Sequence, residues 1–145
     1  MNKVYNRDIL FRGKQVSNDD WIEGYVFSQC IDGDYVPLCI ATEPICANDY
    51  SEILGDWAVV DSSTVGQYTG LTDKNGKKIF EGDIIKVPDC CHCGDAVGFV
   101  YYDCDEAAYC AKCWGIKYQL GADLSSDSIE IIGNIHDNPE LLEES

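Results

Sequence analysis

The chain has 145 residues, 46% of them hydrophobic, and it carries a formal net charge of −16 at pH 7. This size and apolar fraction suit one compact domain, while the negative charge argues against direct nucleic-acid binding, which needs a dense positive surface. No run approaches the roughly 18 apolar residues of a membrane span, and residues 1–7 lack the apolar core of a signal peptide, so we expect a cytoplasmic protein without membrane contact.

The first part of the chain, residues 1–70, is predicted to form a β lobe. Val4 to Phe27 predicts a strand, a turn at Arg12-Gly13-Lys14 and a second strand, because its last seven residues are rich in β-formers. Ile31 to Asp34 predicts another turn, and a returning strand follows it as far as Ile40. Glu43 to Trp57 sustains no period, so we expect a loop there with a single helical turn.

A β-hairpin is expected around Asn75-Gly76, which lies between two apolar, β-prone runs. A tight type I′ turn needs positive φ at both central residues, and Asn-Gly is a preferred pair for it. Turns and strand packing therefore explain the whole stretch from Val65 to Val87, which joins the N-terminal lobe to the rest of the chain.

The second part, residues 71–145, is predicted to form a small SH3-like β-barrel of about five strands. Glu81 to Val87 resembles the opening strand of SH3-like barrels, and Ala96 to Tyr102 supplies the returning strand. Tyr109 to Leu120 predicts the next strand, and Ile129 to Ile135 closes the set.

Period two assigns faces within these strands. One face of the returning strand carries Val97, Phe99 and Tyr101, and one face of the next strand carries Cys110, Trp114, Ile116 and Tyr118. The aromatic residues on these two strands would form a binding face in an open barrel and part of the core in a closed one. The core is the interpretation that we favour.

A short helix is predicted from Asp137 to Glu144. Asn or Asp caps it, Pro139 suits its first position, and early acidic residues favour the positive end of the helix dipole. We expect Leu141 and Leu142 to pack it against the barrel, and His136 to have a capping or surface role rather than an acid–base role.

Four segments together resemble the YopX family, small proteins encoded by phages and prophages that have no assigned biochemical role: Arg7–Lys14, Trp21–Tyr25, Val65–Val87 and Ser128–Leu142. The resemblance implies a phage-type protein that acts inside a bacterial host cell. Two stretches depart from the family pattern, Cys39–Trp57 and Cys90–Cys113. We expect any function peculiar to this chain to lie in them.

The acidic residues are unevenly distributed, because Gln15 to Asp73 contains no Lys or Arg. Two interpretations stay open. The acidic surface serves solubility, or it imitates nucleic acid and occupies the basic groove of a host protein. In addition, the basic N-terminal segment could dock on the acidic face of a second copy, which favours a homo-oligomer.

Nine cysteines are present, and four of them have the spacing of a structural zinc site: Cys90, Cys93, Cys110 and Cys113. Cys91 or His92 could replace one of these ligands. Such a site would be closed, with no open position for catalysis.

The strand predicted for Tyr109 to Leu120 argues against this site. If the strand is continuous, Cys110 and Cys113 point to opposite faces, and only a break at Ala111-Lys112 would bring them to one metal. The alternative is that the cysteines are reduced, buried thiols and that no cofactor is bound.

The sequence contains no Gly-x-Ser-x-Gly elbow and no phosphate-binding P-loop. We therefore expect a non-enzymatic, mainly β protein, in which an N-terminal β lobe is followed by an SH3-like barrel and a short helix. Its expected action is self-association and contact with a host or phage protein. A zinc-stabilised module and an acidic nucleic-acid mimic are the alternatives.

Overall fold

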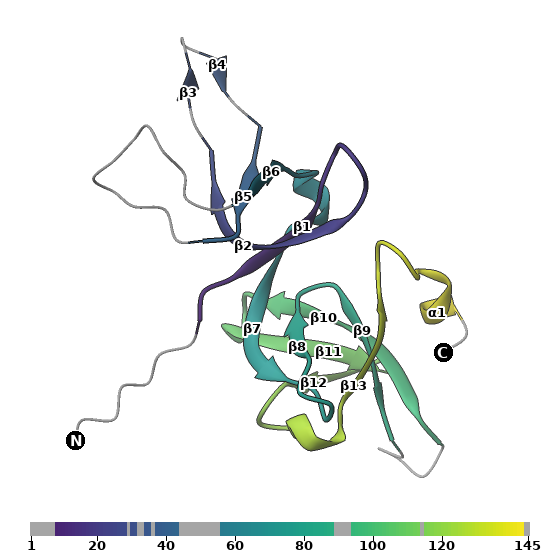
Figure 1. Cartoon of the computed structure of the whole chain (residues 1–145). Helices are drawn as coiled ribbons and strands as arrows, with labels where there is room; N and C mark the ends of the chain where they lie inside the picture. Colours follow the sequence, from purple (N-terminus) through teal and green to yellow (C-terminus); the bar gives the residue numbers. More distant parts are fainter. Residues whose placement is uncertain are drawn as a thin grey trace, which may run out of the picture. The chain divides into compact units, whose positions relative to one another are not determined.

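The computed structural model describes residues 8–28, 30–31, 34–35, 37–43, 56–88, 94–113 and 115–143. Over these residues the protein is mainly β, with antiparallel sheets and one short helix (Figure 1), which confirms the predicted class. No helix in these ranges is long and apolar enough to cross a membrane. The elements are β1 Phe11–Lys14, β2 Trp21–Phe27, β3 Cys30–Ile31, β4 Asp34–Tyr35, β5 Cys39–Ala41, β6 Trp57–Val59, β7 Gly66–Thr72, β8 Lys78–Phe80, β9 Asp83–Val87, β10 Ala96–Asp103, β11 Ala108–Cys113, β12 Ile116–Gln119, β13 Glu130–Asn134 and α1 Glu140–Glu143.

The chain divides into two compact units, Met1–Tyr68 and Thr69–Ser145. In the N-terminal unit the strands pair in the order β6-β5-β2-β1, and β1 also pairs with the first residues of β7. In the C-terminal unit the end of β7 pairs with β8, and a five-stranded sheet follows in the order β12-β11-β10-β9-β13.

Gly13 lies inside β1 and not in a turn. Its register partner is Ile22 in β2, and the chain reverses at residues 16–19, where Asp19 has a φ of 61°. A Cβ at Gly13 would lie 3.1 Å from Val60 Cβ and 3.1 Å from Val65 Cγ2. The predicted turn at Arg12-Gly13-Lys14 is therefore wrong, because this glycine permits close packing of the interior.

Gly24 in β2 marks the point where β5 comes closest. The β2–β5 ladder begins at the next residue, with Tyr25 opposite Ala41. A Cβ at Gly24 would lie far inside the van der Waals radius of the Ala41 carbonyl oxygen, and 3.1 Å from Thr42 Cα. Only glycine fits this backbone approach.

The turn predicted at Ile31 to Asp34 falls between β3 and β4, which pair antiparallel, and its residues 32–33 lie outside the described residues. The returning strand predicted from Tyr35 to Ile40 is divided, because β4 pairs with β3 whereas β5 pairs with β2. Residues 44–55, which make up most of the loop predicted from Glu43 to Trp57, lie outside the described residues. That prediction stays untested.

β7 and β8 form the hairpin predicted at Asn75-Gly76, but its turn is not of type I′. Gly76 has a φ of 82°, but Asn75 does not have the positive φ that a type I′ turn needs. The described non-glycine residues with positive φ are Asp19 and Ala107. The Asp73 N–H donates to the Lys77 carbonyl at 2.8 Å, which leaves a three-residue loop that ends in glycine.

The Asp73 carboxylate explains why this wider loop forms. Its Oδ1 accepts hydrogen bonds from the backbone N–H groups of Asn75 and Lys77, each at 2.9 Å. Its Oδ2 accepts from the N–H of Ile131 in β13, at 3.1 Å. One buried side chain, 5% exposed, therefore fixes the hairpin loop and also contacts the five-stranded sheet.

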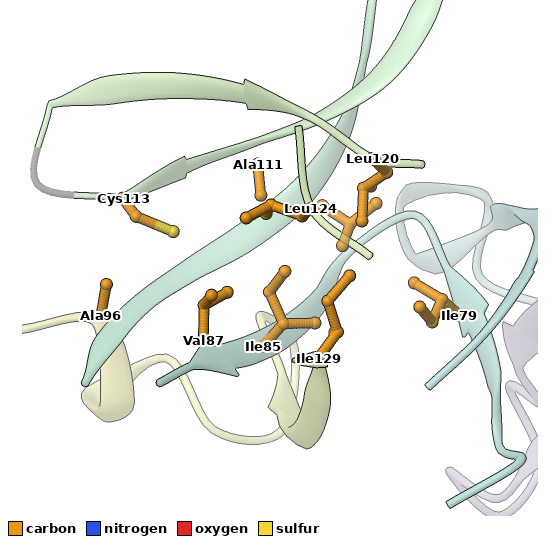
Figure 2. Packing of buried hydrophobic residues seen from close by; sticks show 10 residues of the cluster. Ile79, Ile85, Val87, Ala96, Ala111, Cys113, Leu120, Leu124 and Ile129 are labelled. Atoms are coloured by element: carbon orange, nitrogen blue, oxygen red, sulfur yellow. The ribbon is translucent and has the colours of Figure 1, made fainter. Parts of the chain in front are cut away.

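The core of the C-terminal unit lies on one face of the five-stranded sheet. Figure 2 shows Ala111, Leu120 and Leu124 facing Val87, Ile85 and Ile129 across the core. Each large apolar side chain buried in this way stabilises the fold by roughly 1.5–3 kcal/mol. In β10 the buried residues are Ala96, Gly98 and Val100, so the predicted alternation is confirmed, with Val97, Phe99 and Tyr101 on the opposite face.

The single strand predicted for Tyr109 to Leu120 is wrong, because β11 and β12 form a hairpin at that place. Gly115 lies in the turn with a φ of 76°. In the resulting register Cys110 pairs with Gln119, and Ala111 pairs with Tyr118. Cys110 and Tyr118 thus lie on opposite faces, contrary to the predicted shared face.

β12 and β13 are the outer strands of the five-stranded order, and no pairing joins them in the described ranges. The closed barrel predicted from the sequence is therefore not found there. The terminal helix is confirmed as α1, which lies beside β10. It begins later than predicted, because the Asn138 side chain accepts from the Asn134 N–H at 3.3 Å and belongs to the preceding turn.

Candidate functional site

Cys110 and Cys113, two of the four predicted zinc ligands, both lie in β11 and are buried, 0% and 1% exposed. Cys113 belongs to the core cluster, and Figure 2 shows its side chain in the core near Ala96. Cys110 pairs with Tyr101 and Gln119 on the opposite face of the sheet. The two sulfur atoms are therefore separated by the sheet itself.

The condition for a shared metal is not met in this strand. β11 runs without a break through Ala111 and Lys112, and residues three apart in a strand point to opposite faces. Cys90 and Cys93 lie outside the described residues, and within those residues no group of three or more His, Cys, Asp or Glu side chains could hold a metal. These two thiols do not fit one zinc ion held by all four cysteines, and zinc stays a prediction for metal analysis to test.

Cys110 lies beside a charged cluster on the outer face of the sheet. Burial raises the pKa of its thiol, and the nearby Asp103 and Glu106 carboxylates raise it further. Because the thiolate is the reactive form, a thiol of this kind is a poor nucleophile at neutral pH.

Lys117 in β12 is the cation of the same cluster. Its Nζ binds Glu106 Oε1 at 3.0 Å and Asp103 Oδ2 at 3.1 Å. These two hydrogen bonds raise the pKa of Lys117, and the bond from Lys117 lowers the pKa of Asp103. The cluster ties the β10–β11 turn to β12, which is a structural role.

Two of the YopX-like segments, Val65–Val87 and Ser128–Leu142, meet at one end of the five-stranded sheet. Asp83 is the register partner of Asn134, and the Ile135 N–H donates to the Gly82 carbonyl at 2.8 Å. His136 lies next to this contact, with Nε2 3.8 Å from the position that a Gly82 Cβ would occupy.

The polar side chains at this junction serve the backbone. Asn134 Oδ1 accepts from the N–H groups of His136 and Asp137 at 3.0 and 2.9 Å. Asp83, which is 1% exposed, accepts from the Phe80 N–H through Oδ2 at 2.8 Å. The junction therefore organises turns, and these backbone contacts account for Asn134 and Asp83 in the YopX-like sequence.

The N-terminal unit presents a different kind of surface. Directly paired residues of antiparallel strands share a face, and the register puts Tyr25 in a row with Ala41 and Trp57. Period two along β2 adds Trp21 and Phe27 to the same face. We call the set Trp21, Tyr25, Phe27 and Trp57 the aromatic face.

On the aromatic face Ala41 and Cys39 are buried, 0% and 1% exposed, so the exposed part of this face is Trp57 in the edge strand β6. The opposite face carries Gly13, Ile40 and Val60, which pack together in the interior. Trp57 is 52% exposed and contacts Phe27 edge-on, with ring centroids 6.1 Å apart. A large apolar side chain held in place and half exposed is typical of protein contact surfaces.

Two cations lie at the Trp21 end of the aromatic face. The guanidinium carbon of Arg12 lies 4.9 Å from the centroid of the Trp21 ring, and Lys14 Nζ lies 5.7 Å from it. These distances suit cation–π contacts. Since Gln15 to Asp73 contains no Lys or Arg, positive charge in the described part of this unit is confined to this end.

The aromatic residues predicted in the C-terminal strands do not form one surface. Tyr109 and Tyr118 pack against the core, while Tyr101 lies on the opposite face beside Phe99. Tyr102 is 44% exposed and contacts Tyr109 with ring centroids 5.2 Å apart. Trp114 lies outside the described residues.

The aromatic face is only partly encoded in a local sequence pattern. Trp21, Tyr25 and Phe27 already show period two. Trp57 joins them only through the register of β5 with β6, which requires a pairing of strands separated by a stretch whose sequence carries no periodic pattern.

Comparisons with known proteins agree with the resemblance in the sequence. Residues 10–143 match the family model described as YopX protein. No curated protein matches the chain. Among solved structures, the crystal structure of protein EF1440 from Enterococcus faecalis is similar, with a TM-score of 0.53 and 25% identity, over 94% of this chain and 99% of that chain. Neither description names a substrate, a ligand or a partner.

Proposed function

This chain belongs to the YopX protein family, and we propose that it acts without catalysis, as a self-associating interaction module. The single observation that carries the proposal is Trp57, which is half exposed at the edge of the aromatic face. Partly exposed aromatic anchors supply most of the binding free energy in many protein interfaces.

A second copy of the chain is the occupant that we propose. The aromatic face has Arg12 and Lys14 at one end, while the whole chain carries 26 acidic and 10 basic residues. The carboxylates of a second copy are attracted locally to this basic end, and this local attraction acts against the general repulsion between two copies that each have a net charge of −16.

The placement of the chemically capable side chains supports the non-catalytic part of the proposal. Cys113 is a core residue, Cys110 has a raised pKa, and the backbone of His136 belongs to a turn. We also propose that the C-terminal unit is SH3-like, a module type that commonly presents its surface to other proteins. Its five antiparallel strands in one sheet support this assignment.

The test compares Trp57→Ala with Tyr102→Ala, a matched change at an exposed aromatic residue of the other unit. Light scattering coupled to gel filtration, over a series of protein concentrations, gives the dissociation constant of the oligomer. We expect Trp57→Ala to weaken association about 30-fold, because truncating a central aromatic anchor removes about 2 kcal/mol or more. Tyr102→Ala should leave association unchanged.

Two results would contradict the proposal. One is a wild-type protein that stays monomeric at every concentration tested. The other is an oligomer that is equally sensitive to Trp57→Ala and Tyr102→Ala, which would mean that the aromatic face has no special part in it.

A second candidate function is supported by the exposed acidic residues of the N-terminal unit. Seven of the described acidic residues are exposed: Asp8, Asp19, Asp20, Glu23, Glu43, Asp56 and Asp61. On this proposal the protein imitates nucleic acid and occupies the basic groove of a host DNA-binding protein. It should release such a protein from DNA, and raised salt should weaken the contact steeply. A contact that is insensitive to salt would exclude this function.

A further inference from the structure

The outer strands of the C-terminal unit are β12 and β13 in the five-stranded sheet, and β8 beside β7. An outer strand normally leaves backbone N–H and C=O groups available to another chain. We propose that the side chains of Asp73, Asp83 and Asp123, here called the edge aspartates, close these strands to pairing with a second copy.

β12 is closed by Asp123. The Leu120 N–H bonds to the Tyr109 carbonyl at 3.0 Å, so by alternation the backbone groups of Lys117 and Gln119 face away from β11. The Gln119 N–H donates to Asp123 Oδ2 at 2.8 Å, and its carbonyl accepts from the Asp123 N–H at 2.8 Å. The other outward position is Lys117, whose charged side chain is itself unfavourable for pairing.

β13 is closed by Asp73. The outward N–H of Ile131 donates to Asp73 Oδ2 at 3.1 Å, and the Ile129 carbonyl accepts from the Lys74 N–H at 2.9 Å. Further along, a register shift between Ile131 and Gly133 interrupts the ladder, which also hinders the addition of a regular strand.

β8 is closed by Asp83 together with burial, because Phe80 and Asp83 are only 3% and 1% exposed. The hairpin pairs Asp73 with Lys77, so the backbone of Phe80 faces away from β7. Its N–H donates to Asp83 Oδ2 at 2.8 Å. Each of the three outer strands therefore has an outward N–H group held by a carboxylate.

Carboxylates suit this role for two reasons. A charged acceptor makes a stronger hydrogen bond to a backbone N–H than a neutral carbonyl does, so an incoming strand cannot easily replace it. Two capped strands that approach each other would also bring like charges together. The edge aspartates thus leave the faces of the sheets, rather than their edges, available for association.

The inference does not depend on the aromatic face, and the experiment keeps the two apart by using Trp57→Ala as the background. In that background we compare Asp123→Ala with Asp105→Ala, which removes another exposed carboxylate in the same unit. Because Asp123 is exposed, the fold should tolerate its loss. Asp73→Asn, which keeps one acceptor oxygen, is the second test variant.

We expect sedimentation velocity to show larger species for Asp123→Ala as the concentration rises, and constant size for Asp105→Ala. In dilute solution the Gln119 amide should exchange about tenfold faster or more, because its acceptor is lost. In concentrated solution the amides of β12 should become protected by the second copy.

The proposal is overturned if Asp123→Ala and Asp73→Asn are folded, by circular dichroism, and keep the size of the Asp105→Ala control at every concentration. Association of Asp123→Ala without added protection of the β12 amides would also overturn it. Loss of self-association in Trp57→Ala bears on the proposed function alone.

Discussion

The two units of this protein differ in which parts of their sheets are available for contact. The N-terminal unit has one half-exposed aromatic side chain, Trp57, at the edge of the aromatic face, and positive charge beside Trp21 at its other end. The C-terminal unit uses Asp73, Asp83 and Asp123 to satisfy the N–H groups of its outer strands. The difference indicates how a β protein can direct its contacts: side-chain surfaces are presented, while unpaired backbone, which would bind any strand, is covered.

The largest effect is expected from Gly24→Ala, which breaks the sheet that carries the aromatic face. Its Cβ would overlap the Ala41 carbonyl, and a backbone atom cannot move aside without breaking the β2–β5 ladder. We expect the free energy of unfolding to fall by about 4 kcal/mol, measured by urea denaturation.

Gly76→Ala is the control for this change. It meets nothing within 4 Å, but it places alanine at a φ of 82°. The loss of stability there should be about 1 kcal/mol. Equal losses at the two glycines would contradict the close approach of β5 at Gly24.

The second-largest loss of unfolding free energy is expected from Asp73→Ala. The change removes the acceptor of three backbone N–H groups, those of Asn75, Lys77 and Ile131. We expect a loss of about 3 kcal/mol, since a buried donor without a partner is destabilising. Asp105→Ala should change stability by no more than about 0.5 kcal/mol in the same urea titration. If Asp73→Ala lost no more stability than Asp105→Ala, the three hydrogen bonds to the Asp73 carboxylate would not stabilise the fold.

The smallest change in unfolding free energy is expected from acidic pH, through the Asp73 carboxyl. Burial raises the pKa of the Asp73 carboxyl, but the hydrogen bonds from Ile131, Lys77 and Asn75, with the charge of Lys77, outweigh it and hold the pKa below its usual value. A depressed pKa in the folded state adds stability above the unfolded-state pKa of about 3.9. That stability is lost as the pH falls through the lower pKa of the folded protein.

The unfolding free energy of wild type should therefore fall more steeply below about pH 4 than that of Asp73→Asn, which has no proton to take up at this position. Unfolding curves at a series of acidic pH values measure the difference. Parallel curves for the two proteins would contradict the depressed pKa.

Much of the fold follows from the sequence, because period two and Asn-Gly are local signals. They located β9, β10 and the β7–β8 hairpin. Gly13 was misread because glycine serves close packing as well as turns, and the pattern does not separate the two uses. Gly115 lies between two β-prone runs, so the β11–β12 hairpin looked like one strand.

The candidate sites depended on contacts between distant parts of the chain. Asp73 bonds to Ile131, 58 residues later, and Trp57 reaches the aromatic face through the β5–β6 register. No local pattern encodes either contact. The spacing of Cys110 and Cys113 suggested a shared metal, and the sheet places the two thiols on opposite faces.

Amide hydrogen exchange of the wild-type protein, compared between dilute and concentrated solution, tests most directly whether the chain self-associates through the aromatic face and not through its strand edges. We expect a higher protein concentration to slow amide exchange in β2 and β6, which carry the aromatic face. Exchange in β12 and β13, which are closed by Asp123 and Asp73, should not change. Added protection in β12 or β13, with β2 and β6 unchanged, would contradict self-association through the aromatic face.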